Sequence, residues 1–179
     1  MDVYQLKITL QYSEPPIWRR IQVAADTQLG KLHHILQAAM GWTDSHLHQF
    51  VIGDMSYGVP DPDDIDEIKS ERSVPLNLVA QAGDTLIYEY DFGDGWVHAL
   101  KIEKALPAGP GTRYPVCLAG ARACPPEDCG GPPGYQNLVE VLNNTSHEEY
   151  KETREWIGPE FDSEAFDLDD INRALKKIK

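Results

Sequence analysis

The regular alternation of apolar and polar residues near the N-terminus limits the fold more than any other feature of this chain. Apolar or aromatic side chains occupy every second position there: Tyr4, Leu6, Ile8, Leu10 and Tyr12. This period of two belongs to a strand that buries one face. Pro15 and Pro16 interrupt the pattern, because proline fixes φ and lacks a backbone donor. Residues 17–23 resume it, so the sequence predicts an antiparallel hairpin.

A helix and a third strand are expected after this hairpin. Apolar residues follow at helical spacing across residues 29–40. Asp26 or Thr27 is placed to cap the start of this helix, and Gly41 to end it, because glycine tolerates the left-handed conformation. Residues 46–52 have the composition of a strand. This order of hairpin, helix and strand resembles the start of a β-grasp core, an analogy that concerns the fold and not the function.

A second hairpin is predicted in the middle of the chain. Its strands, residues 86–91 and 96–103, flank a turn that contains Asp94 and Gly95. An Asp-Gly pair favours tight turns because glycine supplies a positive φ. The elements together predict an α+β fold, in which helices pack on one face of a mixed, mostly antiparallel sheet.

The 179 residues are expected to form a single domain with three parts. These parts are a core over 1–104, a loop rich in Cys, Pro and Gly over 105–134, and C-terminal helices over 135–179. Frequent proline and glycine predict little regular structure in the loop. Short helices are expected near 135–143 and 147–157, and a last helix after Asp167.

Composition narrows the class of protein. Hydrophobic residues make up 41% and charged residues 25% of the chain, values typical of a globular domain. We see no signal peptide and no apolar run long enough to span a membrane, which predicts a soluble, cytoplasmic protein. The formal net charge is −13, which disfavours general binding to a nucleic-acid backbone. An acidic run from Asp61 to Glu67 is expected to be a solvated loop.

Two stretches are too particular to be generic. The first runs from Tyr88 to His98 (YEYDFGDGWVH), and the second from Cys117 to Gly131 (CLAGARACPPEDCGG), followed by Gly134 and Tyr135. Together they resemble the plasmid pRiA4b ORF-3-like family, some members of which are labelled transposon passenger proteins.

The ends of the chain, Tyr4–Arg20 and Phe161 to Leu175, also look like the ends of that family. The resemblance therefore covers essentially the whole chain. It implies membership of a family of unknown function. The passenger label describes a genetic context and not a chemistry.

The three cysteines are the first candidate site. They are Cys117, Cys124 and Cys129, spaced C-x6-C-x4-C. Thiolates bind zinc, and a metal would stabilise a segment too poor in apolar residues to hold itself together. The fourth ligand would be His98, with His46 or His48 as an alternative. The other readings are three ordinary, partly buried thiols, or a pair of them in a disulfide.

The histidines divide by their expected surroundings. His46 and His48 alternate along the predicted strand, so they should leave it on one face. His98 shares its strand face with Trp96, which suggests a hydrogen-bonded core residue as the alternative to a ligand. Two further histidines, His33 and His34, are expected on the solvated face of the first helix.

Carboxylates near the second turn form another candidate site. Asp91, Asp94 and Glu89 could hold magnesium for phosphoryl chemistry, and Glu127 and Asp128 could join them if the loop folds back. The simpler interpretation is that Asp91 braces the turn through bonds from its side chain to the backbone.

Three functions follow from these patterns. The sequence lacks a phosphate-binding loop, a dinucleotide fingerprint and a nucleophile elbow. This favours a binding or interaction domain, not an enzyme, with a protein partner and a structural zinc in the cysteine loop. The first alternative is a metal-dependent hydrolase or nuclease that uses Asp91, Asp94 and His98. The second, suggested by the family label, is a DNA-associated accessory protein of a mobile element.

Overall fold

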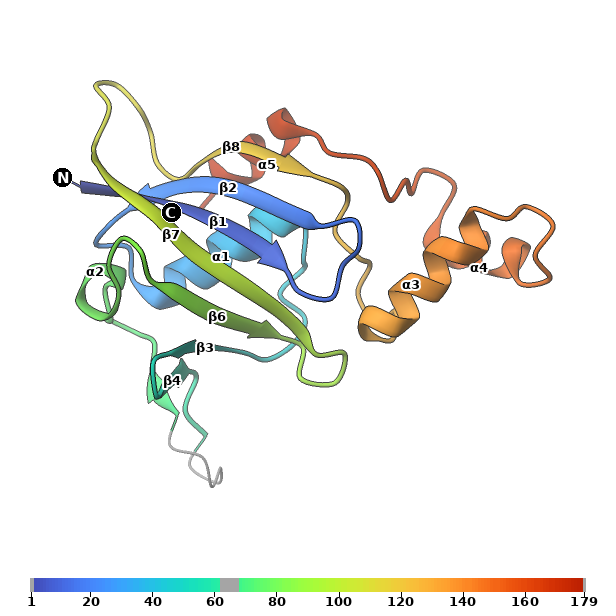
Figure 1. Ribbon diagram of the computed structural model, residues 1–179, viewed down its shortest axis with the longest axis horizontal. Helices are drawn as coiled ribbons and strands as arrows, with labels where there is room; N and C mark the ends of the chain where they lie inside the picture. Colours follow the sequence, from blue (N-terminus) through green and yellow to red (C-terminus); the bar gives the residue numbers. More distant parts are fainter. Residues whose placement is uncertain (1, 62–67, 179) are drawn as a thin grey trace.

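One eight-stranded sheet organises residues 2–61 and 68–178, the part of the chain that this computed structural model describes (Figure 1). The strands are β1 (Asp2–Leu10), β2 (Ile17–Ala24), β3 (His48–Ile52), β4 (Met55–Gly58), β5 (Lys69–Ser70), β6 (Thr85–Tyr90), β7 (Trp96–Pro107) and β8 (Val116–Ala121). Their order in the sheet is β5-β4-β3-β6-β7-β1-β2-β8. The β4–β5 pair is parallel and the other pairs are antiparallel, which confirms the predicted α+β class with a mostly antiparallel sheet.

Both predicted hairpins are present. In the first, Leu6 pairs with Ile21, and both side chains are fully buried. In the second, Tyr90 pairs with Trp96 across the turn. Alternate residues of β7, from Trp96 to Ile102, are buried on one face, as the period of two predicted. Tyr12 departs from the pattern, because it lies beyond β1 in the turn and is exposed.

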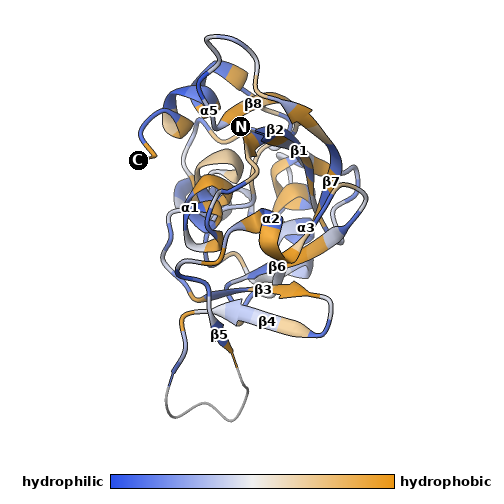
Figure 2. Ribbon diagram, turned by 90° about the vertical axis from the view of Figure 1, so that its left-hand side faces the viewer, coloured by the Kyte–Doolittle hydropathy of each residue, from blue (hydrophilic) through white to orange (hydrophobic). Residues whose placement is uncertain are grey.

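Five helices complete the described fold. They are α1 (Leu29–Met40), α2 (Leu76–Val79), α3 (Gly131–Leu142), α4 (Tyr150–Ile157) and α5 (Leu168–Leu175). Helices α1 and α5 contact each other and lie behind the sheet, whereas α3 and α4 lie beyond one end of the strands (Figure 1). Figure 2, turned by 90°, shows α1 and the strands as two separate layers. The N-cap of α1 is Gln28 without a side-chain bond, so neither Asp26 nor Thr27 caps this helix. Gly41 ends α1 at a φ of 113°, as predicted.

The segment 105–134 is more regular than its composition predicted. It contains β8, which pairs with β2 at the edge of the sheet, and α3 begins within it at Gly131. The proline and glycine that suggested a loop lie mostly outside these elements. Gly120, inside β8, is needed for a close approach, because a Cβ there would collide with the ring of Phe166.

Two further expectations concern the surface. The acidic run from Asp61 to Glu67 lies outside the described residues apart from Asp61 itself. Among the helices that the structure describes, each is too short or too polar to cross a membrane.

Candidate functional site

Three carboxylates surround the imidazole of His46 beside the turn of the second hairpin. The Nε2 atom of His46 lies 3.5 Å from Oδ2 of Asp91, 3.8 Å from Oε2 of Glu127 and 3.2 Å from Oδ1 of Asp128. His46 precedes β3, Asp91 follows β6, and the other two residues lie between β8 and α3. The fold thus brings together three segments that are far apart in the sequence.

Hydrogen bonds to the backbone fix both the main chain and the carboxylate of Asp91. The Asp91 amide donates to the carbonyl of Leu47 (2.9 Å), which continues the pairing of β3 with β6. Its Oδ1 accepts from the amides of Gly93 (3.1 Å) and Asp94 (3.3 Å), while Oδ2 faces His46. These contacts agree with the interpretation that Asp91 braces the turn. The same bonds orient the free oxygen toward the imidazole.

Hydrogen bonds hold one carboxylate oxygen of Glu127, and the other oxygen faces His46. Its Oε1 accepts from the amide (2.8 Å) and the hydroxyl (2.9 Å) of Thr43, and from the hydroxyl of Tyr90 (3.0 Å). The Tyr90 hydroxyl in turn accepts from the amide of Ser45 (3.0 Å). Burial is the main cause that raises the pKa of Tyr90, so its hydroxyl keeps the proton that it donates.

Two of the facing atoms lack a hydrogen bond. Nε2 of His46 and Oε2 of Glu127 are both shielded from solvent, and neither has a hydrogen-bond partner among the described residues. A buried polar atom without a partner carries a desolvation cost. Asp128, by contrast, is 73% exposed, so the group opens to solvent on one side. One imidazole nitrogen and three carboxylate oxygens form a ligand set that suits zinc or manganese.

The other predicted carboxylates lie outside this group. Oδ2 of Asp94 accepts from the amide of Gly130 (3.2 Å), which ties the turn to the start of α3. Glu89 accepts a hydrogen bond from Gln49 on the neighbouring strand. Of the three carboxylates proposed around the turn, only Asp91 joins the group, and Glu127 and Asp128 fold back onto it.

His98 is a core residue. It is fully buried, and its Nδ1 lies 3.2 Å from the carbonyl oxygen of Tyr88 and 3.1 Å from that of Trp96. Nε2 accepts from the indole of Trp42 (3.4 Å), so Nδ1 carries the proton. Burial lowers the pKa of His98 to about 4. Both nitrogens are used within the core, which leaves none for a metal or for acid–base chemistry.

The three cysteines remain free thiols in this fold. Cys117 is buried in β8, and Cys124 and Cys129 are partly buried in the segment before α3. Burial raises the pKa of each thiol, to about 12 for Cys129. Among the described residues, two groups of three potential metal ligands have their ligand atoms within 4.8 Å of one another, and neither contains a cysteine. The geometry therefore favours a carboxylate–imidazole site over the cysteine loop.

The second of these groups consists of His33, His34 and Asp44. His33 was expected in solvent but is buried, with Nδ1 2.8 Å from the hydroxyl of Tyr88 and Nε2 2.7 Å from Asp44. The reason is its position four residues after Leu29, on the apolar side of α1. Both nitrogens of His33 are thus already bonded.

His48 does not act together with His46. Its Nε2 lies 2.9 Å from Oε2 of Glu71, and its ring stacks on that of His33 at 3.5 Å between centroids. The expectation that His46 belongs to this strand is wrong, because β3 begins at His48 and leaves His46 in the preceding loop. Alternation applies only within a strand.

The match to a family model decides the relationship. Residues 2–170 match the model described as plasmid pRiA4b ORF-3-like protein. The chain belongs to this family. A relative, the uncharacterized protein y4hQ of Sinorhizobium fredii (strain NBRC 101917 / NGR234), is 44% identical over 180 residues, which is 99% of this chain and 92% of the relative. The resemblance found in the sequence is thereby confirmed.

A solved structure supports both the fold and the family. The crystal structure of MM3350, a protein of unknown function from Methanosarcina mazei Go1, matches with a TM-score of 0.85 and 40% identity. The match covers 94% of this chain and 97% of that one. Neither relative brings a described activity with it, so the function of this family member must be argued from its own residues.

Proposed function

We propose that this protein is a divalent-metal-binding domain in which His46, Asp91 and Asp128 hold the ion and Glu127 stands ready as a further ligand. One observation carries the proposal: a shielded imidazole nitrogen faces three carboxylates from two other segments of the chain, and it makes no hydrogen bond to any of them. A bound cation would satisfy Nε2 of His46 and Oε2 of Glu127 together.

The ligand chemistry selects among metals. A single imidazole with carboxylates suits zinc or manganese better than magnesium or calcium, which prefer oxygen ligands alone. The ion would join the loop before β3, the turn after β6 and the segment before α3. Such a bond would stabilise the Gly- and Pro-rich segment, which is the role that the sequence suggested for a metal.

The experiment is titration of metal-free protein with Zn²⁺, Mn²⁺, Mg²⁺ and Ca²⁺ by isothermal calorimetry, with metal content measured by mass spectrometry. We expect about one Zn²⁺ or Mn²⁺ per chain and a loss in affinity of at least about 10-fold in H46Q and D128N. H147Q is the matched control, since His147 lies between α3 and α4 and its ring Nδ1 accepts from the amide of Glu149, two residues later.

Two results would overturn this assignment. H46Q that binds as tightly as the wild type would exclude His46 as a ligand. Loss of metal in C124S, with H46Q unaffected, would place the ion in the cysteine loop instead.

A metal-dependent hydrolase is the second candidate function. The exposure of Asp128 favours it, because catalytic metal sites keep an open position whereas structural sites are closed. Its test is hydrolysis of bis(p-nitrophenyl) phosphate by Mn²⁺-loaded protein. Turnover that H46Q abolishes would support the enzyme, and turnover equal in both proteins would reject it.

A further inference from the structure

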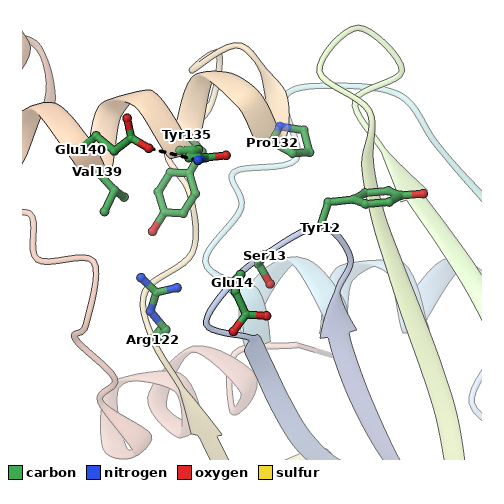
Figure 3. A pocket seen from close by; sticks show the side chains of 9 residues that line it. Tyr12, Ser13, Glu14, Arg122, Pro132, Tyr135, Val139 and Glu140 are labelled. Atoms are coloured by element: carbon green, nitrogen blue, oxygen red, sulfur yellow. Dashed lines mark hydrogen bonds between the residues drawn. The ribbon is translucent and has the colours of Figure 1, made fainter.

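A separate pocket of about 340 Å³ lies between the turn that joins β1 to β2 and the helix α3 (Figure 3). Tyr12 and Glu14 line it from the turn, Arg122 from the end of β8, and Tyr135 and Glu140 from α3. Its volume lies in the range of small-ligand sites. None of these residues belongs to the group around His46.

The buried hydroxyl of Tyr135 points to a missing partner. Tyr135 is only 6% exposed, and its hydroxyl has no hydrogen-bond partner among the described residues. Figure 3 shows its ring extending from α3 toward Arg122, with the hydroxyl at the end of the ring that faces Arg122. Buried tyrosine hydroxyls ordinarily find a partner. A ligand in this pocket can supply it.

The charge around the pocket is negative. Among the described residues, Glu14 and Glu140 make no ion pair, although Glu140 accepts a hydrogen bond from Gln136. Arg122 is already paired, because its Nε and Nη2 each lie 2.8 Å from Oε1 of Glu164. Its Nη1 donates to the carbonyl of Pro15 (2.7 Å). The carboxylates of Glu14 and Glu140, neither of which makes an ion pair with a described residue, therefore make the potential in the pocket negative, and the net charge of −13 adds to it.

Tyr12 completes the rim. Its side chain is 82% exposed, and its backbone has a φ of 59°, a conformation that is costly for a bulky residue. Exposed aromatic faces attract cations. The aromatic rings and the carboxylates of this pocket thus both favour a cation.

We propose that this pocket binds an aliphatic organic cation with N–H donors, an alkylguanidinium or alkylammonium group. The hydroxyl of Tyr135 accepts a hydrogen bond from the cation, the carboxylates of Glu14 and Glu140 balance its charge, and Tyr12 covers its stem. This site is independent of the proposed metal site, so H46Q should leave it unchanged.

The test compares three probes of similar shape by titration monitored in ¹H–¹⁵N correlation spectra. They are n-butylguanidinium (cationic), n-butylurea (neutral) and n-butyl phosphate (anionic). We expect saturable shifts from n-butylguanidinium at the amides around Glu14, Arg122 and Tyr135, and much weaker ones from the other two. Binding of n-butylurea or n-butyl phosphate as tight as that of n-butylguanidinium would overturn the proposal, as would an absence of saturation up to 10 mM, roughly a weak-fragment limit.

Two variants locate the site without disturbing the fold. Y135F removes only the hydroxyl and should weaken n-butylguanidinium binding about 10-fold, the scale of a hydrogen bond to a charged group. E140Q removes an exposed charge and should weaken it about 3-fold. E148Q, an exposed glutamate outside the pocket, is the control and should bind as the wild type does. Wild-type affinity in both Y135F and E140Q would place the cation elsewhere and overturn the proposal.

A further titration with a peptide identifies the source of the cation. Acetyl-Gly-Arg-Gly-amide carries the same guanidinium on a protein-like backbone. Tighter binding of this peptide than of n-butylguanidinium assigns the pocket to an arginine side chain of a partner protein. Tighter binding of the small cation assigns it to a free metabolite-like amine or guanidine. Both results require the loss in Y135F.

Discussion

His98 and His46 occupy two contrasting regions of one fold. His98 points from β7 into the core, where two backbone carbonyls and the Trp42 indole use both ring nitrogens. His46 lies just before β3, where its Nε2 faces three carboxylates without a hydrogen bond. The comparison teaches that a histidine among aromatic strand neighbours is fixed for packing. A histidine at the point where several segments end together keeps a nitrogen available for a ligand.

The largest effect expected of the core histidines is a loss of stability at acidic pH. Burial lowers the pKa of both His33 and His98 from 6.5 to about 4. Between these values the unfolded chain binds protons that the folded chain does not, so the free energy of unfolding falls as the pH falls from 6.5 toward 4. Each histidine should cost on the order of 3 kcal/mol by pH 4, and above pH 6.5 this loss is absent. Urea unfolding from pH 4.5 to 7.5 measures it.

Other acidic groups also change protonation in this range, so a variant is needed as a reference. H33Q should flatten the profile between pH 4.5 and 6.5, because it removes one of the two groups. A slope that is the same in H33Q and the wild type would contradict the buried, neutral state of His33.

The next effect in size is the removal of His98. H98A leaves a cavity and deprives the Trp42 indole of its acceptor, so the free energy of unfolding should fall by about 3 kcal/mol. The affinity for metal in the protein that remains folded should not change. If H98A lost the metal while staying folded, the division between a core histidine, His98, and a metal-binding histidine, His46, would be wrong.

The stability contributed by His46 should instead depend on metal. A metal at 100 times its dissociation constant stabilises the folded state by about 2.7 kcal/mol. The wild type should show this gain in urea unfolding and H46Q should not. An equal gain in both proteins would separate the ion from His46.

The contact between the turn of the second hairpin and α3 supports the group around His46. A Cβ at Gly131, where φ is 68°, would collide with the carbonyl oxygen of Asp94. G131A should therefore cost about 2 kcal/mol and weaken metal binding, since the turn carries Asp91. Gly53 has a similar φ of 59° but open space around it, so G53A should cost about 1 kcal/mol. Equal losses in the two variants would show that the collision is relieved elsewhere.

The smallest effect concerns the cysteine segment. Cys124 is partly buried near Arg19 and is not among the grouped ligands. C124S should lower the free energy of unfolding by about 1 kcal/mol, equally with and without metal, because only a buried packing contact changes. A loss confined to the metal-loaded protein would support the zinc site that the sequence suggested.

Much of the fold could be predicted because local patterns determine it. The period of two gave both hairpins, and helical spacing gave α1 and α5. Strand β8 escaped prediction because its stability comes from pairing with β2, almost 100 residues earlier in the chain, and proline and glycine surround it. The burial of His33 was within reach, since Leu29 lies one helical turn before it.

The site was harder to predict, because it depends on three loops whose meeting no local pattern records. Asp91, Glu127 and Asp128 were all candidates, but His98 was chosen over His46. The register gives the missing signal: His48 pairs with Tyr90, so the residues just outside this pair, His46 and Asp91, end up side by side. Thr43 and Tyr90, which hold Glu127, carried no sequence signal beyond their own polarity.

The strand order has a consequence for synthesis on the ribosome. The first strand made, β1, lies in the interior of the sheet, and its neighbour on one side is β7. Leu10 pairs with His98, so the 88 residues that follow Leu10 must be translated first, which takes about 4 to 18 s at ordinary elongation rates. During that interval the hairpin β1–β2 presents an unpaired edge on which another nascent chain could align. Closely spaced ribosomes on one message therefore put this protein at risk of pairing with its own copies, and sparse initiation should raise its yield.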